Sequence, residues 1–198
     1  SYLVFPPLFG HQYSHCWIDF RDIHDAYMQT KGITYFENSR RATLAQRAYC
    51  IDNPFNHIGY SDSLWGLTAG DGPNGYAARG APPAQNDNGT IAPTAAASSI
   101  AFAPEVSVPC IRNMYNAYKP QLWTAYGFRD GFSLNQAWWG PDELGIDQGP
   151  NSAKPVSGFQ PMRSPAPPLR MYSQSARWVI ESARVRTSTS RESAVLKY

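Results

Sequence analysis

A long run of turn-forming residues constrains the fold of this chain more than any other feature. Gly, Pro, Asn and Asp dominate residues 68–90, and these residue types set turns but give a core few apolar side chains. Residues 53–92 are therefore predicted to be mostly loop. Loops of this length inside a domain usually carry function. The segment NDNGTIAPT (86–94) combines carboxylate, amide and hydroxyl groups with glycine, which suits a cleft for a polar ligand.

Helix signals lie on both sides of this loop region. Thr34 and Glu37 have the spacing of a capping box, and Gly32 is a suitable stop for a preceding helix. Pro104 fits the first turn of a later helix, whereas Pro109 predicts a kink or a late start. Helices are expected at residues 14–31, 34–50, 93–99, 104–118 and 120–126. No clear alternation of the strand type is present, so the sequence predicts helices joined by long loops.

Charge divides the chain into two parts. Residues 1–150 hold nine Lys and Arg against thirteen Asp and Glu, whereas residues 151–198 hold eight against two. The acidic first part disfavours a nucleic-acid groove. The second part is rich in Ser, Arg and Pro and is predicted to be weakly structured apart from one amphipathic helix at 175–185, although contact with nucleic acid or another anion is the alternative. We therefore expect two units, 1–150 and 151–198.

The sequence gives no sign of a disulfide framework, a membrane span or a metal site. Cys16, Cys50 and Cys110 are odd in number and widely spaced, so buried thiols are predicted. No run of about 18 apolar residues occurs, so no membrane partner is expected. His11 and His15 stand four residues apart, as some zinc ligands do, but no Glu completes a metalloprotease pattern. Hydrogen bonds or sugar contacts are expected of these histidines instead.

Three carboxylates stand where chemistry is possible, and each has a plainer alternative. Asp147 lies in a segment bounded by glycines, where a ligand can approach closely, although Asp in such a place often only forms a turn. Asp87 fits either bonds to sugar hydroxyls or an Asx-turn. Glu37 is suited to one of two roles, either a carboxylate in the cleft or the partner of Thr34 in the helix cap. Aromatic residues make up 14% of the chain, which suits either stacking on sugar rings or a large aromatic core.

Nine segments along the chain carry a family resemblance. In order they are PLFGHQYSH (7–15), WIDFR (17–21), YFENSRRA (35–42), WGLTAGDGP (65–73), GYAARG (75–80), DNGTIAPT (87–94), FAPE (102–105), YGFRD (126–130) and GIDQGP (145–150). Over about residues 3–150 the chain resembles the glucoamylase-like domain of bacterial endo-β-1,2-glucanases and the transglycosylating domain of cyclic β-1,2-glucan synthases.

The resemblance implies a fold and an activity. The fold is an all-α (α/α)6 toroid, of which this chain would match about the C-terminal half. The activity is hydrolysis, or transglycosylation, at the β-glucosidic bonds of a β-glucan, above all β-1,2-glucan, with no cofactor. The alternative is a truncated, catalytically incomplete carbohydrate-binding fragment that needs the missing half or a second chain. A periplasmic or secreted location and a homo-oligomer that covers an exposed apolar face are further expectations.

The resemblance also implies roles for particular residues. Glycoside hydrolysis needs two carboxyl groups that flank the scissile bond. Asp147 is expected to be the base that activates water, with Glu37 and Asp87 as further catalytic candidates. The expected substrate-binding residues are His11, His15, Trp17, Asp19, Arg21, Tyr35, Trp65, Tyr76, Arg79, Thr90 and Gln148.

The chain departs from the family pattern in two places. The family's general acid is a Glu upstream of the region matched here, and this chain shows no counterpart. After GIDQGP the family continues as an apolar helix, whereas this chain turns at Asn151 into the basic second part. A truncated or frame-altered family member is therefore expected.

Overall fold

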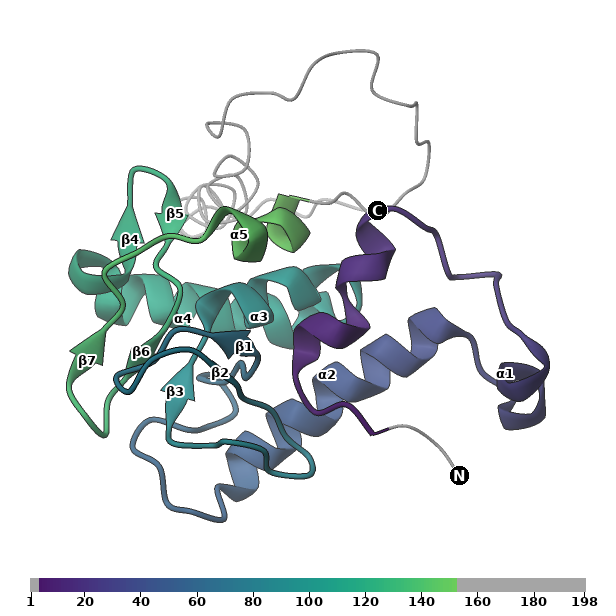
Figure 1. The fold of residues 1–198 in the computed structure, drawn as a ribbon, viewed down its shortest axis with the longest axis horizontal. Helices are drawn as coiled ribbons and strands as arrows, with labels where there is room; N and C mark the ends of the chain where they lie inside the picture. The colour runs from purple at the N-terminus through teal and green to yellow at the C-terminus, as the bar shows by residue number, and fades with distance from the viewer. Residues whose placement is uncertain (1–3, 153–198) are drawn as a thin grey trace, which may run out of the picture.

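Helices and very short strands alternate along residues 4–152, the part of the chain that this computed structural model describes (Figure 1). The α-helices are α1 (Ala26–Lys31), α2 (Tyr35–Asp52), α3 (Pro93–Ser98), α4 (Pro104–Leu122) and α5 (Gly145–Ser152). The 3-10 helices are η1 (Leu8–His11), η2 (Tyr13–Cys16) and η3 (Ser99–Ala101). The strands are β1 (Ala69–Gly70), β2 (Ala77–Ala78), β3 (Thr90–Ile91), β4 (Trp123–Thr124), β5 (Gly127–Phe128), β6 (Phe132–Ser133) and β7 (Trp138–Trp139).

The strands form three small antiparallel sheets, so the prediction of an all-α toroid is wrong. The sheets have the orders β1-β2, β3-β6-β7 and β4-β5, and in the three-stranded sheet Thr90 lies opposite Ser133. Each strand is two residues long, which is too short to show the alternation by which a strand is read from sequence. The ladders give hydrogen-bond partners to the backbone of loops that carry few apolar side chains.

The long helix α2 confirms its predicted start signal. Thr34 has an extended backbone, and its Oγ1 accepts a hydrogen bond from the Glu37 backbone N–H at 3.1 Å. The helix runs two residues past the predicted end, to Asp52, and Asn53 in the left-handed region terminates it.

The prediction of a single helix at residues 14–31 is wrong. It is replaced by η2, an irregular connection and the short helix α1. Asp19 accepts a hydrogen bond from the Arg21 backbone N–H at 3.1 Å, which favours a turn. Asp25 is extended and accepts from the Met28 N–H at 2.8 Å, so it caps a new helix. The predicted stop at Gly32 is confirmed, with φ 65°.

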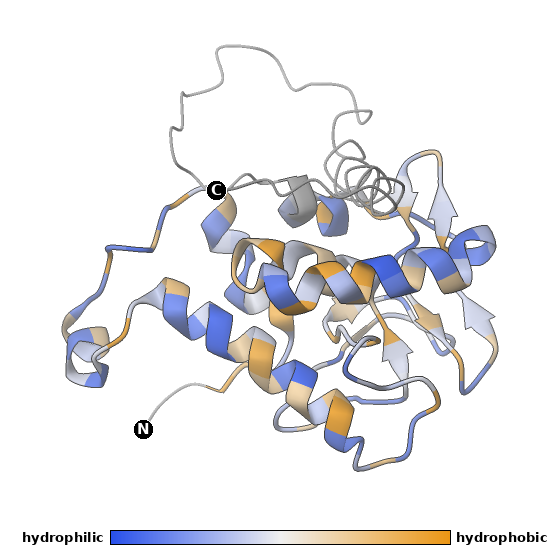
Figure 2. Cartoon of the chain, turned by 180° about the vertical axis from the view of Figure 1, so that it is seen from behind, coloured by the Kyte–Doolittle hydropathy of each residue, from blue (hydrophilic) through white to orange (hydrophobic). Residues whose placement is uncertain are grey.

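The second long helix, α4, begins at Pro104 as predicted but continues through Pro109. Its one non-helical residue is Tyr118, two positions before Pro120. The separate helix expected at 120–126 is only the last turn of α4, and the chain then enters β4. Figure 2 shows hydrophilic and hydrophobic residues mixed along both long helices, as expected of helices that cover a core on one face.

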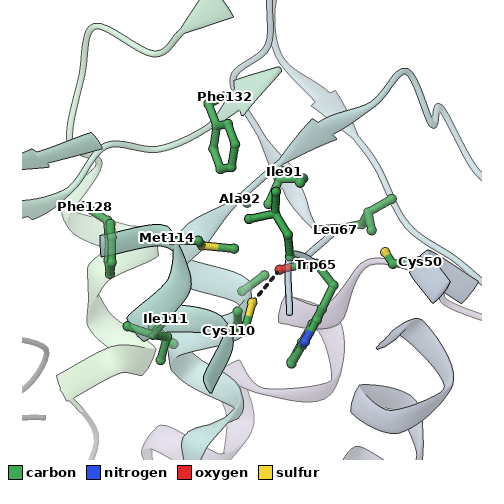
Figure 3. Close-up of a cluster of buried hydrophobic side chains, with 14 of the residues drawn as sticks. Cys50, Trp65, Leu67, Ile91, Ala92, Cys110, Ile111, Met114, Phe128 and Phe132 are labelled. Atoms are coloured by element: carbon green, nitrogen blue, oxygen red, sulfur yellow. Dashed lines mark hydrogen bonds between the residues drawn. The ribbon is translucent and has the colours of Figure 1, made fainter. Parts of the chain in front are cut away.

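The core surrounds the small-residue helix α3, which is buried along its whole length and packs against α4 and α5. The side chains of Trp65, Phe128 and Phe132 are among the largest that are fully buried, and Figure 3 shows them around this core. The Cys110 thiol donates to the Trp65 carbonyl at 3.5 Å. Cys50 and Cys110 are buried free thiols, as predicted, whereas Cys16 is half-buried.

Gly66 brings an extended segment into direct contact with α3. Its φ is +137°, and a Cβ there would lie 2.7 Å from the Ala92 carbonyl oxygen and 3.3 Å from the Ala96 nitrogen. A Gly66→Ala protein is therefore expected to lose about 3 kcal/mol of unfolding free energy, measured by denaturant titration. Gly75→Ala is the control, since φ is +94° there but nothing lies within 4 Å. An equal loss in both proteins would rule out the contact with α3 as the cause.

The two predicted units fall partly outside the described residues. The helix expected at 175–185 lies in 153–198, as does the second unit, 151–198, except for its first two residues, which end α5. Within residues 4–152 no helix combines the length and the apolar character that crossing a bilayer requires.

Candidate active site

Asp147 lies in the first turn of α5. Its backbone N–H and that of Gln148 donate to the Leu144 carbonyl at 3.1 and 3.0 Å, so the segment bounded by glycines is the start of a helix. The first turn of a helix leaves N–H groups unpaired and has a positive dipole end, and both favour a carboxylate. Only 4% of Asp147 is exposed, so solvent does little to screen its carboxyl group from these N–H groups.

Tyr13 reaches Asp147 from the other end of the described chain. The Tyr13 hydroxyl, on η2, donates a hydrogen bond to Asp147 Oδ1 at 3.0 Å. Burial, and then the charge of Asp147, raise the pKa of the Tyr13 phenol. Tyr13 therefore stays neutral and acts as the donor of this hydrogen bond.

The Gln148 side chain joins α5 to β5 by a hydrogen bond. Its Nε2 donates to the Phe128 carbonyl at 2.5 Å. A Cβ on Gly127 would lie 3.2 Å from Gln148 Oε1, so this glycine lets the side chain lie close against the strand. Gln148 was predicted to bind substrate, and the structure places it beside Asp147 with its amide on the protein backbone.

Asp130 lies in the connection between β5 and β6. It is 2% exposed, and its Oδ2 accepts from the Asp71 backbone N–H at 2.6 Å. Burial first, and then its interaction with the Asp147 carboxyl group, raise the pKa of Asp130 well above its usual range.

Arg79 is a buried clamp beside these carboxyl groups. Its Nη1 donates to the carbonyls of Gly70 and Asp71 at 2.8 and 3.2 Å, its Nη2 to that of Gly75 at 3.1 Å, and its Nε to Asn88 Oδ1 at 3.1 Å. The guanidinium thus joins two loops and places a positive charge near Asp130. Arg79 was predicted to bind substrate, and in this structure protein oxygens occupy its donors.

Exposed side chains occur on the segments that carry these carboxyl groups. Tyr76 is close enough to Tyr13 for their charges to interact, and its own side chain lies largely in solvent. Tyr126 is exposed in the turn next to Gly127, and Ile146 is exposed next to Asp147 in sequence. Asp71 is half-buried, and burial, followed by the charges of Asp130 and Asp142, raises its pKa. Tyr76, Tyr126, Ile146 and Asp71 are called the rim residues.

Asp87 belongs to a separate network. Its side chain is 1% exposed and accepts from the hydroxyls of Tyr49 and Tyr60, each at 2.7 Å. Its Oδ1 also accepts from the Gly89 backbone N–H at 3.2 Å, which is the Asx-turn contact, and lies 3.3 Å from His57 Nε2. Thr90, another predicted site residue, is buried in β3 close by in sequence.

Several predicted site residues lie at the N-terminal side of the structure. Asp19 and Arg21 form an exposed ion pair, and the Arg21 hydrogen bond lowers the pKa of Asp19 to about 2. Trp17 is largely exposed. His11 hydrogen-bonds the Phe5 carbonyl through Nε2 at 2.8 Å. His15 is bonded to Ser39, and burial lowers its pKa to about 4, so it is neutral at physiological pH.

Three more predicted residues have structural partners. Glu37 forms an exposed ion pair with Arg41 at 2.8 Å. Tyr35 donates to Asp25 Oδ2 at 2.6 Å. Trp65 is fully buried in the core. Their predicted roles stay predictions, but the structure does not bring them to Asp147. Within residues 4–152 no group of three or more His, Cys, Asp and Glu could hold a metal ion.

Sequence reasoning missed Tyr13, Asp71 and Asp130 as members of the site. They come from loops that meet only in the folded chain, since Asp71 and Asp130 are 59 residues apart and Tyr13 and Asp147 are 134 apart. Tyr13, Asp71 and Asp130 all lie in segments that the resemblance had marked, and this was the one signal available.

Comparison with known proteins yields a family and several relatives. The Glycoamylase family model, described as "Putative glucoamylase", matches residues 1–154. An exo-β-1,2-glucooligosaccharide sophorohydrolase (non-reducing end) from Parabacteroides distasonis is 38% identical over 144 residues, which is 73% of this chain and 19% of that protein.

Solved structures are similar as well. A "putative glucoamylase" from Bacteroides uniformis is 39% identical, with a TM-score of 0.68 over 89% of this chain and 37% of the other. An endo-β-1,2-glucanase from Chitinophaga pinensis, in complex with sophorotriose and glucose, is 32% identical, with the same TM-score and the same coverage. The chain thus spans well under half the length of these relatives. Because the family model matches more than three quarters of its residues, the chain belongs to the Glycoamylase family.

Proposed function

We propose that this chain carries the hydrolytic site of a glycoside hydrolase that acts on β-glucosidic bonds of β-1,2-glucan or its oligosaccharides. The observation that carries the proposal is the buried Asp147 carboxyl group, which accepts a hydrogen bond from the Tyr13 hydroxyl and lies in the first turn of α5. The names of the sophorohydrolase and the endo-β-1,2-glucanase support the choice of substrate.

Asp147 suits the role of general base. A carboxylate can take a proton from a water molecule as the water oxygen attacks the anomeric carbon. The bond from that carbon to the glycosidic oxygen then breaks, and the leaving oxygen receives a proton from a general acid. The family resemblance puts that acid on a Glu upstream of the matched region. In transglycosylation a sugar hydroxyl would replace the water.

The exposed aromatic side chains at the rim are proposed to hold sugar rings. Tyr76, Tyr126 and Trp17 are all largely exposed, and Trp17 lies on the segment that follows η2. Flat apolar side chains with a few polar groups are typical of sites that bind small polar ligands. The proposed location is the periplasm or the cell exterior, which rests on the family resemblance.

A second candidate function is that of a carbohydrate-binding fragment that needs another chain for catalysis. The observation in its favour is that several large apolar side chains between residues 4 and 27 are exposed, namely Val4, Phe5, Ile18, Ile23 and Tyr27. Exposed apolar patches usually mark a binding partner. A second copy of this chain is the proposed partner.

The test of the proposed function is the release of reducing sugar from β-1,2-glucan by the purified chain, with β-1,3- and β-1,4-glucans as comparison substrates. We expect release from β-1,2-glucan well above that from the other two. Equal release from all three would overturn the substrate, and retained binding without release would favour the second candidate. Size-exclusion chromatography checks the partner, because a monomer at all concentrations would contradict it.

A further inference from the structure

The Asp147 carboxyl group needs a partner that fixes its orientation. The last torsion angle of an Asp side chain is broad, so packing alone leaves the plane of the carboxyl group poorly defined. Gly149, two residues further on, adds no support, because no neighbouring described segment lies within 4 Å of a Cβ placed there. A base takes a proton from water only where its oxygen points at that water, so the orientation of this group matters to the rate.

The Tyr13 hydroxyl meets both the side chain and the backbone at the start of α5. It lies 3.0 Å from Asp147 Oδ1 and 3.4 Å from the Ile146 carbonyl oxygen. A hydroxyl has one proton to donate, and the shorter distance directs it to the carboxyl oxygen. Because a hydrogen bond is directional, this contact limits the rotation of the carboxyl plane about the Cβ–Cγ bond of Asp147.

Polar contacts on both sides of Tyr13 hold η2 in place. Before it, Gln12 is 2% exposed, and its Nε2 donates to Ser99 Oγ, on η3, at 2.8 Å. After it, His15 Nε2 lies 3.0 Å from Ser39 Oγ, on α2. The segment η2 also packs against α5. The Tyr13 hydroxyl thus reaches α5 from a support that is fixed to two other helices.

We propose that Tyr13 is a positioning residue, whose hydroxyl fixes the Asp147 carboxyl group in the orientation from which it takes a proton from water. The inference rests on the proposed role of Asp147 as the general base. It also assigns roles within the segment GHQYSH (10–15), where Gln12 and His15 hold the chain in place and Tyr13 reaches the site. Tyr13 keeps its own proton, because burial and then the charge of Asp147 raise the pKa of the phenol.

Tyr13→Phe is the decisive variant, because it removes the hydroxyl and keeps the ring, whose centroid lies 4.9 Å from that of Phe9. We expect kcat on β-1,2-glucan to fall about tenfold while KM stays within about twofold. Tyr49→Phe is the matched control, since it removes a tyrosine hydroxyl that donates to another buried carboxylate, Asp87, at 2.7 Å. The control is expected to keep kcat within about twofold. A Tyr13→Phe protein with full kcat, or one whose loss lies in KM, would overturn the inference.

A double variant shows whether Tyr13 acts through Asp147. In an Asp147→Asn background the side chain can no longer take a proton, so its orientation ceases to matter to the rate. Tyr13→Phe is therefore expected to lower kcat in that background by less than about twofold. A second loss of about tenfold there would show that the hydroxyl acts independently of Asp147, and the inference would then be wrong.

A further measurement does not depend on activity. Loss of the hydrogen bond is expected to lower the Tm by about 3 °C when Tyr13→Phe is made in the unaltered protein. The same change in an Asp147→Ala background, which lacks the carboxyl acceptor, is expected to lower the Tm by less than about 1 °C. Equal shifts in both backgrounds would refute the hold of Tyr13 on Asp147. An unaltered chain without glucanase activity would instead overturn the proposed function, so the two failures are distinguishable.

Discussion

An Asp147→Asn protein is expected to hydrolyse β-1,2-glucan with a kcat about 10³-fold lower than that of the unaltered protein. The amide oxygen can still accept the hydrogen bond that the Tyr13 hydroxyl donates at 3.0 Å, so α5 keeps its place. The amide cannot take a proton from water, so the chemical step alone is impaired. Initial rates of reducing-sugar release, together with glucan binding by calorimetry, measure the two effects separately.

The matched control is Asp52→Asn, the same chemical change on an exposed carboxylate at the end of α2. This control is expected to keep the full rate. If Asp147→Asn retained more than about a tenth of the activity, Asp147 would not be the general base, because loss of such a group costs at least about 10²-fold. Loss of binding along with activity would instead point to a role in holding the substrate.

Asp87→Asn is expected to destabilise the protein by about 3 kcal/mol while leaving kcat of the folded molecules nearly unchanged. The two hydroxyls of Tyr49 and Tyr60 point at opposite oxygens of Asp87, each at 2.7 Å. Burial and the Asp87 contacts raise the pKa of both phenols, so both are donors. An amide would place an N–H against one of these donors. The buried conflict costs more than one ordinary hydrogen bond.

The orientation of His57 adds to this conflict. Asn135 Oδ1 accepts from the Ile58 N–H at 2.6 Å, so its Nδ2 donates to His57 Nδ1 at 2.9 Å. The imidazole proton is therefore on Nε2, which lies 3.3 Å from Asp87 Oδ1. Two hydroxyls thus hydrogen-bond the Asp87 carboxylate, and the His57 Nε2–H lies beside it without forming a hydrogen bond to any described residue.

Denaturant titration measures the stability of Asp87→Asn, and Tyr49→Phe is the comparison. Tyr49→Phe removes one donor without creating a donor conflict, so its cost is expected to be about 1 kcal/mol. An Asp87→Asn protein that unfolded normally but had lost hydrolysis would show that Asp87 takes part in the chemistry.

Local signals predicted the helices well where one residue supplies the cap. Thr34 and Gly32 acted as the sequence predicts, because their effect depends on neighbours within four residues. The helix expected at 14–31 failed because Asp19 and Asp25 bond to nearby backbone N–H groups and favour a turn and a new cap. The strands were missed because pairs such as Thr90 with Ser133 depend on distant residues and on loop closure.

The candidate site shows the same contrast between local signals and contacts of distant residues. Asp147 was identified from its glycines and from the family resemblance, and the structure places it, almost completely buried, at the start of α5. Asp130 follows Arg129 in sequence, which suggests a surface ion pair, but Arg129 donates to the carbonyls of Gly140 and Pro141. Asp130 meets Asp71 instead, and no spacing in the sequence predicts this contact.

The contact between Tyr13 and Asp147 has a consequence for the order of folding. It joins residues 134 positions apart, and the entropy lost in closing a loop grows with its length. Contacts of this range form more slowly than helical turns. α2 and α4 can therefore be complete while Asp147 still lacks its donor. The return of hydrolysis during refolding would then report the meeting of these two distant segments, later than any signal from helix content.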